Sequence, residues 1–332
     1  MDPYIPLFTS VKTMTTVFLN TFRVKRHLHF KTTLVENRRK YSSGKWNFHT
    51  TEPESHLLLP PRPSRTKSLA GTVQFHSSYL FLHDVEDPNN WLRVFNSPLF
   101  SRLKERLGKR NVLVNICQSK PYYGGTLWTK GKHQDSLHEG FFFPVISSDE
   151  AVSVLEGHLD KLTDEEDDDD SNAVAVAEMA AVESRIAKEL ASAGPYFYIC
   201  CHGHRDCRCG IRGGDLANAL TDELESRNML TDEQGRHRLG RVGHVGGHKN
   251  APNLIIFPHG DWYGNLEPSD LPNLVNHYIQ SSPLLSLSEL LLHGPNRYQW
   301  RGCMGMTKQE QLDAFQKSQQ QQAGSNDDPM LT

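Results

Sequence analysis

An unbroken run of seven acidic residues at 164–170 divides this 332-residue chain into two segments that share one order of predicted elements. Because like charges repel one another, the run is expected to be a solvated linker and not a packed element. Before it, hydrophobic spacing predicts the order β-α-β-β-α, with elements at 79–83, 98–107, 111–117, 140–146 and 149–159. After it, an Ala-rich helix at 173–190 precedes the same order, at 196–200, 213–227, 238–244, 253–257 and 268–280.

This order of elements is that of the core of the thioredoxin-like fold. In that fold a cis-proline holds a backbone edge beside the redox loop. Pro252 stands at the matching place, directly before the apolar strand predicted at 253–257. The sequence therefore predicts an α/β protein made of two thioredoxin-like halves.

The expected domain boundaries follow from changes in composition. Clustered prolines among Ser, Thr and Arg predict a linker at 46–71. The first half is expected to span 72–160, the acidic linker 161–172 and the second half 173–307. The last segment, 308–332, is rich in Gln and has no apolar periodicity, so it is expected to be disordered.

Positive charge is concentrated at the amino terminus, where residues 1–45 contain nine Lys or Arg and two acids. This basic, hydroxyl-rich composition predicts a mitochondrial transit peptide and a matrix location, and the alternative is a disordered basic tail. The net charge of −3 indicates no general attraction to nucleic acid. Since no run approaches ~18 consecutive apolar residues, no membrane span is expected.

Four of the six cysteines lie close together, at 200, 201, 207 and 209, between a predicted strand and a predicted helix. Such clustering favours metal or redox chemistry in a reducing compartment over a secreted disulfide framework. His244 and His248 lie in a glycine-rich segment, which is expected to be a loop able to wrap an inorganic centre. Two thiolates and two imidazoles can bind zinc or a Rieske-like iron–sulfur cluster. The wide spacing of Cys200 and Cys209 fits a zinc turn poorly and favours the larger group.

Three sequence motifs resemble a known family. They are C-x-H-G-x-R-D-x-R-C-G at Cys200–Gly210, H-x-G-G-H-K at His244–Lys249 and W-R-G-x-x-G at Trp300–Gly305. Over 196–305, and more weakly over 76–160, the chain is similar to the sucrase/ferredoxin-like family of thioredoxin-like ferredoxins. The resemblance implies a thioredoxin-like ferredoxin domain in the second half and a [2Fe-2S] cluster, while zinc is the alternative that the residue types alone leave open. The ligands that it implies are Cys200, Cys209, His244 and His248.

The sequence departs from the family pattern at three positions. Cys201 and Cys207 occupy variable positions of the first motif, and Pro252 stands where a Gly is common. The two additional thiols leave open which cysteines bind the cluster, and Cys201 is the strongest competitor because it adjoins Cys200.

Six other residues are expected around the cluster: His202, Arg205, Asp206, Lys249, Pro252 and Trp300. Asp206 is expected to fix the loop through hydrogen bonds or an Arg pair more than to act as a base. Trp300 either packs in the core or shields the cluster from water. Cys117, on an apolar strand, is expected in the core.

These observations predict a mitochondrial [2Fe-2S] protein that acts in electron transfer or redox regulation with protein partners still to be identified. It is expected to be an electron carrier more than a substrate-specific enzyme. No G-x-G-x-x-G nucleotide motif is present, so a reductase would be a separate protein. Two alternatives remain open. One is a thiol–disulfide oxidoreductase or redox quality-control factor that uses Cys201, Cys207 or Cys303, and the other is a structural zinc-binding interaction protein.

Overall fold

The computed structural model describes residues 59–130 except 96, 137–143, 153, 155, 157–159, 194–280 and 296–325. The predicted transit peptide, the acidic linker and the helix predicted at 173–190 lie outside these residues.

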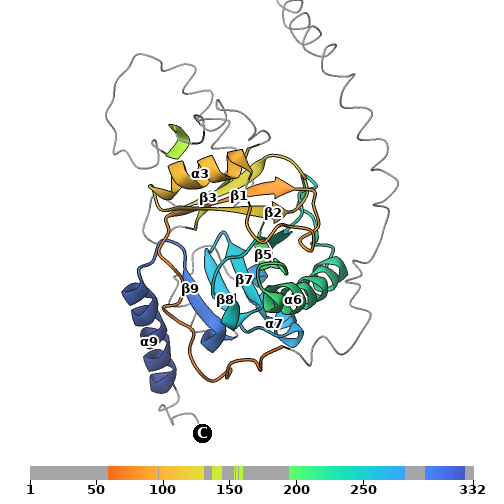
Figure 1. The fold of residues 1–332 in the computed structure, drawn as a ribbon. Coiled ribbons are helices and arrows are strands. Elements are labelled where there is room, and N and C mark those ends of the chain that lie inside the picture. Colours follow the sequence, from red (N-terminus) through yellow and green to blue (C-terminus); the bar gives the residue numbers. More distant parts are fainter. Residues whose placement is uncertain are drawn as a thin grey trace, which may run out of the picture. The chain divides into compact units, whose positions relative to one another are not determined.

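One mixed sheet of nine strands organises the described residues, in the order β4-β3-β1-β2-β6-β5-β7-β8-β9 (Figure 1). Its first four strands are β1 (Ser78–Asp84), β2 (Val112–Gln118), β3 (Gly125–Thr129) and β4 (Glu139–Phe143). The others are β5 (Tyr196–Cys200), β6 (Leu239–Val242), β7 (Asn253–Phe257), β8 (Asp261–Gly264) and β9 (Trp300–Cys303). The expectation of an α/β protein is confirmed, and strands from both sides of the acidic run belong to one sheet.

The first strand set, β1–β4, and the second strand set, β5–β9, contain the same pairing pattern. β1 is parallel to β2 and antiparallel to β3, which pairs antiparallel with β4. In the same way, β5 is parallel to β6 and antiparallel to β7, which pairs antiparallel with β8. The two sets meet where β2 pairs with β6, through Cys117 with Val242 and Gln118 with Arg241. This junction is short, and the two strands are not paired outside it.

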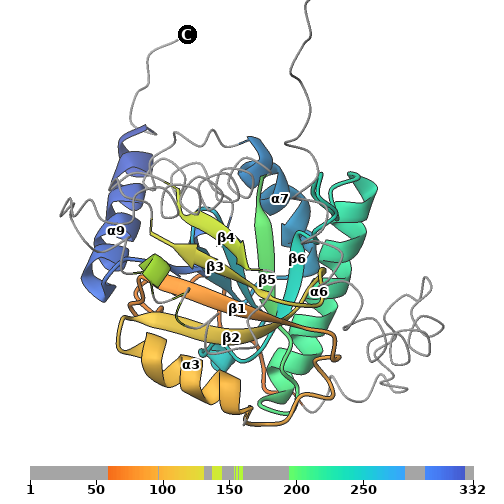
Figure 2. The ribbon, with the colours of Figure 1, turned by 90° about the horizontal axis from the view of Figure 1, so that it is seen from above.

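The helices are α3 (Pro98–Gly108), α6 (Cys207–Ser226), α7 (Leu271–Gln280) and α9 (Lys308–Ser325). Short 3-10 turns occur at η2 (His248–Asn250), η3 (Pro268–Asp270) and η4 (Arg297–Gln299). Figure 2 shows α3 beside β2 and α6 beside β6, while Figure 1 shows α9 next to β9. None of the described helices combines the length and the apolar character that crossing a membrane requires.

Alternation along the strands divides the buried side chains between the two faces of the sheet. On β5, Phe197 and Ile199 belong to a helix-side core with α6, α7 and α9. Tyr196 and Tyr198 belong instead to a second cluster, here called the shared core, because both strand sets contribute to it. Its members are Val73, Tyr79, Phe81, Cys117, Trp128, Tyr196, Tyr198, Val242, Ile255, Phe257, Trp262 and Met304.

Aromatic contacts join the two strand sets through this shared core. Phe81 stacks on Tyr198 with ring centroids 4.1 Å apart, and Trp128 stacks on Phe257 at 4.6 Å. The Trp128 indole also donates a hydrogen bond of 3.1 Å to the Tyr198 hydroxyl. Large rings buried between the sets contribute far more packing than the two residue pairs of the β2–β6 junction.

The structure adds three strands that the sequence analysis did not predict, namely β3, β8 and β9. Each is only four or five residues long, and each is held by antiparallel neighbours. The helix predicted at 213–227 begins earlier, at Cys207, because Asp206 caps it. The segment 59–77 forms neither helix nor strand, and its Arg62 donates 2.8 Å to the carbonyl of Leu266, which lies just after β8.

The prediction that 308–332 is disordered is wrong for residues 308–325, which form α9. Thr307 and Glu310 form reciprocal capping hydrogen bonds at its start, of 2.6 and 3.3 Å. The buried positions are Gln311, Phe315 and Ser318, one face of a helix. Because two of these three side chains are polar, apolar spacing does not reveal the helix.

Candidate metal centre

Cys200 is the last residue of β5. Successive side chains of a strand point to opposite faces, so Cys200 and Cys201 lie on different sides of the sheet. Cys200 and Cys201 are both fully buried. Cys201 lies in the helix-side core, whereas Cys200 packs with Cys209 and Ala251 in a small cluster of its own. Of the two adjacent thiols, Cys200 therefore faces the candidate site.

Asp206 brings the second thiol into place by starting α6. Its carboxylate accepts 3.0 Å from the Arg208 backbone N–H and 2.9 and 2.8 Å from the Arg208 guanidinium. These bonds lower the pKa of Asp206. The expectation that Asp206 fixes the loop is confirmed, and the cap sets Cys209 in the first turn of α6.

Close packing of α6 on the end of β5 depends on a glycine. A Cβ at Gly213 would lie 2.0 Å from the Cys200 carbonyl oxygen. The helix can approach the strand end only where this side chain is missing, and that approach holds Cys209 near Cys200.

The third side chain comes from the loop after β6. Gly246 and Gly247 have φ of +81° and +67°, in the left-handed region that favours glycine. The loop places Nδ1 of His244 3.8 Å from the Cys209 sulfur. The ligand atoms of Cys200, Cys209 and His244, hereafter the Cys/His cluster, all lie within 4.8 Å of one another.

His248, the fourth predicted ligand, lies beside this group. It opens the turn η2, and its ring centroid is 5.6 Å from that of His244. Its side chain is 48% exposed, and its Nδ1 lies 3.8 Å from the Asp206 carboxylate. The structure therefore brings three of the four predicted ligands together and sets the fourth at the exposed side of the group.

The two buried thiols differ in acidity. Interaction with the Cys209 thiol lowers the pKa of Cys200 well below its ordinary value, against the effect of burial. The same interaction, together with burial, raises the pKa of Cys209. One of the two thiols thus ionises more readily than the other, so the site favours a single negative sulfur.

Arg301 on β9 is a site residue that the sequence analysis did not single out. Its side chain is buried, and it donates 2.9 Å to the Asn253 side chain and 3.1 and 3.0 Å to Oγ1 and the carbonyl oxygen of Thr72. Burial lowers its pKa to about 10, and the charges of Cys200 and Cys209 oppose this. Arg301 is therefore a cation at neutral pH that acts electrostatically on both thiols. The only signal in the sequence was its place in the W-R-G motif.

The His244 loop closes directly over this cation. A Cβ at Gly247 would lie 2.4 Å from Nη2 of Arg301. Within the described residues, no carboxylate lies within ion-pair distance of Arg301. The guanidinium charge is thus left available to anions in the site.

The other predicted residues have structural positions. His202 donates 2.8 Å from Nε2 to the Leu92 carbonyl, and its ring contacts Trp91 and Phe95 at 5.8 and 5.0 Å. It therefore fastens the cysteine loop to the first half of the chain. The Ala251–Pro252 peptide bond is cis, as predicted.

Three further predicted residues are either exposed or packed in the helix-side core. Arg205 and Lys249 are exposed. Trp300 is fully buried in the helix-side core and donates 2.8 Å to Asp261, so it packs in the core and does not shield the thiols.

The remaining cysteines are free thiols in the structure. Burial raises the pKa of Cys201 to about 12 and that of Cys303 well above its ordinary value. Cys303 is a buried donor to the His259 carbonyl at 3.3 Å, and Cys117 lies in the shared core as expected. Only Cys207 is exposed.

Comparison with known proteins gave a family match and several relatives. A family model described as Sucrase/ferredoxin-like matches residues 69–291. Altered inheritance of mitochondria protein 32 of Meyerozyma guilliermondii is 36% identical over 90 residues, which cover 26% of this chain and 30% of that protein. Actin patches distal protein 1 of Saccharomyces cerevisiae is 28% identical over 142 residues, 40% of this chain and 42% of that protein. Each match thus spans less than half of the relative.

A solved structure was also found. It is the thioredoxin-like [2Fe-2S] ferredoxin from Aquifex aeolicus, with a TM-score of 0.22 and 14% identity. The match covers 26% of this chain and 81% of that one.

Proposed function

Because the chain belongs to the sucrase/ferredoxin-like family, as its motifs predicted, we propose that it is an iron–sulfur redox protein. The proposed cofactor is one [2Fe-2S] cluster held by two cysteines and two histidines. The proposed ligands are Cys200, Cys209, His244 and His248. The observation that carries the proposal is the convergence of two buried thiols and an imidazole within 4.8 Å.

The chemistry of the donor groups fits such a cluster. Thiolates and imidazoles are the ligands of Rieske-type centres, in which neutral imidazoles raise the reduction potential relative to four thiolates. When bound, the cluster would supply one-electron transfer. The apolar contacts of Ala251 and Val245 limit the access of water to the thiols.

The positive charge of Arg301 favours the reduced, more negative state of the proposed cluster. A reduced centre carries one more negative charge than an oxidised one, and a buried cation stabilises that charge at low dielectric. The N-terminus of α6, where Cys209 lies, has the same sign of charge. We therefore propose that this chain sets the potential higher than its ligands alone would give.

His248 marks the side of the site from which electrons would be exchanged. It is about half exposed, whereas both thiols are fully buried. A protein partner can therefore approach the proposed centre most closely at this histidine. We therefore propose that a protein partner binds on this side of the site in electron transfer or redox regulation.

Two further parts of the proposal concern the cell compartment and the two halves of the fold. The basic segment 1–45 and the names of the relatives support a mitochondrial protein, with the matrix as the proposed compartment. The matching strand pairings support two thioredoxin-like halves, at 72–160 and 173–307, of which the second is the ferredoxin domain.

The test is the composition and spectrum of the full chain purified without oxygen. Visible absorption, an EPR signal after reduction, and iron and acid-labile sulfide in equal amounts are expected. Zinc in a colourless protein would support the structural zinc alternative and contradict the proposal. A colourless, metal-free protein with dithiol activity would support the oxidoreductase alternative, which the burial of Cys201 and Cys303 disfavours.

Substitutions identify the ligands. Cys200→Ser and Cys209→Ser should each abolish the native spectrum. Cys201→Ser is the matched control, because it removes an adjacent, equally buried thiol that faces the helix-side core. Exchange of His244 or His248 for Cys should lower the midpoint potential, since an anion replaces a neutral ligand. A spectrum lost in Cys201→Ser but kept in Cys200→Ser would overturn the assignment.

A further inference from the structure

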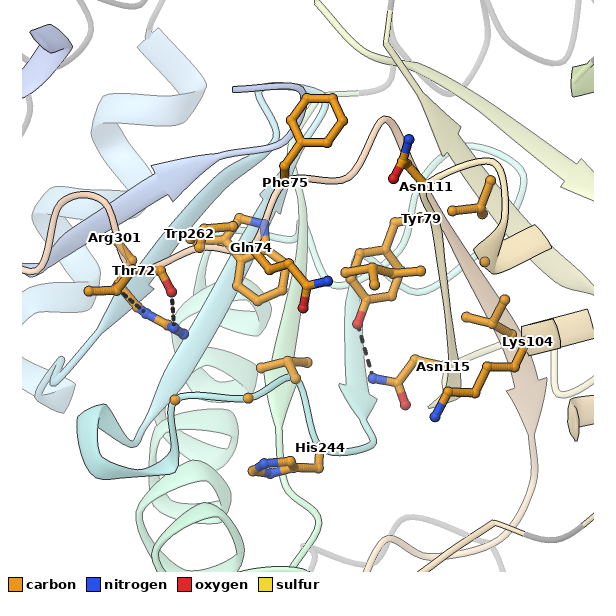
Figure 3. Close-up of a pocket in the computed structure, with 18 residues that line it drawn as sticks. Thr72, Gln74, Phe75, Tyr79, Lys104, Asn111, Asn115, His244, Trp262 and Arg301 are labelled. Carbon is orange, nitrogen blue, oxygen red and sulfur yellow. Dashed lines mark hydrogen bonds between the residues drawn. The ribbon is translucent and has the colours of Figure 1, made fainter. Parts of the chain in front are cut away.

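A cavity of about 590 Å³ opens where β2 and β6 separate. The two strands pair only at Cys117 and Gln118. The Gly243 N–H still donates 3.0 Å to the Ile116 carbonyl, and from His244 onwards the chain turns away into the His244 loop. Residues 111–115 form one wall, the segment 72–75 with Trp262 and Arg301 forms another, and residues 244–247 close the cavity on the side of the Cys/His cluster (Figure 3). This volume suits a small organic molecule.

The charges around the cavity are of one sign. Among its eighteen described lining residues are Lys104 and Arg301, and none is Asp or Glu. Arg301 uses three N–H groups on Thr72 and Asn253 and has two more to donate. The charges that offset Arg301 are those of Cys200 and Cys209, so it is the remaining N–H groups of Arg301 that would attract an anion in the cavity. Lys104, an exposed residue of α3, extends toward the same space (Figure 3).

The remaining wall includes three aromatic side chains, of which Tyr79 and Trp262 each have only 2% of their surface exposed. The rings of Tyr79 and Trp262 lie 6.0 Å apart, tilted by 39°, and Phe75 is 42% exposed. The Arg301 guanidinium lies 5.8 Å from the Trp262 ring centroid. Aromatic faces and a guanidinium plane both stack on planar rings.

Polar groups that could orient such a ring come from β2. Its edge facing β6 is paired only at Cys117 and Gln118, so the main chain of 112–115 borders the cavity without a neighbouring strand. The Asn115 amide donates 3.1 Å to the Tyr79 hydroxyl and 3.2 Å to the Gly243 carbonyl. Because the Tyr79 hydroxyl accepts in this pair, its own O–H can still donate to a bound molecule.

We propose that this cavity binds a small planar aromatic anion, which would lie between Lys104 on one side and Arg301 on the other, with its ring against Tyr79 and Trp262 (Figure 3). Nothing in the binding depends on a metal. Where the proposed cluster is present, the bound molecule would lie next to His244, one of the proposed cluster ligands.

Binding is tested by isothermal titration calorimetry of the full chain with three probes. Naphthalene-2-sulfonate has both ring and charge, 2-naphthol has the ring alone, and methanesulfonate has the charge alone. The first should bind with one site per chain, and the other two at least about tenfold more weakly, as expected when a charged hydrogen bond or a stacked ring is lost. Equal binding of 2-naphthol or of methanesulfonate would overturn the proposal.

Variants locate the site. Lys104→Gln should weaken naphthalene-2-sulfonate about tenfold, since one charged contact is removed. Lys109→Gln is the control, because this exposed lysine directly follows the last residue of α3 and does not line the cavity. Leu113→Trp, which fills the cavity, should abolish binding in a protein with an unchanged circular dichroism spectrum. Unchanged affinity in Lys104→Gln, or equal losses in both lysine variants, would refute the assignment. The assay does not detect iron, so its failure leaves the proposed function standing.

Discussion

Asp261→Asn should remove a pH-dependent loss of stability that the buried carboxylate imposes on the native protein. Asp261 is fully buried at the start of β8 and accepts 2.8 Å from the Trp300 indole and 2.7 Å from the Tyr278 hydroxyl. Both donors are neutral. Burial therefore outweighs the two hydrogen bonds and raises the pKa of Asp261 from 3.8 to about 6.

The sign and size of the effect follow from proton linkage. Below pH 3.8 the carboxyl group is protonated in both the folded and the unfolded chain, and no penalty arises. Between this value and about 6, the unfolded chain releases its proton first, so the free energy of unfolding falls as pH rises. At 1.36 kcal/mol per pKa unit, the full penalty above pH 6 is about 3 kcal/mol.

The assay is urea unfolding of the full chain at pH 4 and pH 7, followed by tryptophan fluorescence at equal metal loading. The Asn side chain loses one acceptor, which costs about 1 kcal/mol at both pH values. Because part of the penalty is already present at pH 4, the variant should gain about 2 kcal/mol relative to the native chain between pH 4 and pH 7. Histidines whose pKa is lowered by burial, such as His76 and His138, also titrate in this window. Both proteins contain them, so their contributions to the pH dependence cancel in the comparison.

Asp222→Asn, on the exposed surface of α6, controls for the removal of one negative charge. If Asp261→Asn and the native chain show the same pH dependence, Asp261 is not ionised at a cost inside the fold, and the reasoning from burial fails.

Three further predictions concern other parts of the chain. Deletion of 1–45 should leave a folded, cluster-competent protein that isolated mitochondria no longer import, and import at the native level would contradict the transit peptide. In thermal unfolding, Gly247→Ala should destabilise the protein by about 1–3 kcal/mol more than Gly235→Ala. Both glycines have a positive φ, but only a Cβ at 247 would meet Arg301. Equal losses of stability would show that the loop moves to make room for the Cβ. Thr307→Ala should cost about 1 kcal/mol and speed amide hydrogen exchange in α9, and unchanged exchange would show that the cap is dispensable.

Strong local patterns in the sequence were sufficient for part of the fold. The apolar run Asn253–Phe257 was predicted with its observed ends, and β1, β2 and α3 agree within two residues. The loop role of Asp206 and the cis bond before Pro252 were also predicted. These features depend on neighbours in the chain, where residue type and spacing carry the information.

Features that depend on distant pairing could not be predicted. β8 and β9 are four residues each and are defined by pairing with each other and with β7. Arg301 reaches the thiols only because β9 joins this sheet edge, so no local pattern distinguishes it from a surface arginine. His244 and His248 look equivalent in sequence, but the left-handed turn at Gly246 and Gly247 directs one toward the thiols and leaves the other exposed.

The shared core has a consequence for the order in which the chain is synthesised. A ribosome releases β1–β4 well before β5 and β7, so Phe81 and Trp128 emerge before Tyr198 and Phe257 exist to cover them. During that interval the nascent first strand set exposes large rings and an unpaired β2 edge, which are the features that holding chaperones recognise and that promote aggregation. Folding of the first set is therefore expected to wait for the second, and ribosome-bound chains that stop at the acidic run should remain sensitive to protease.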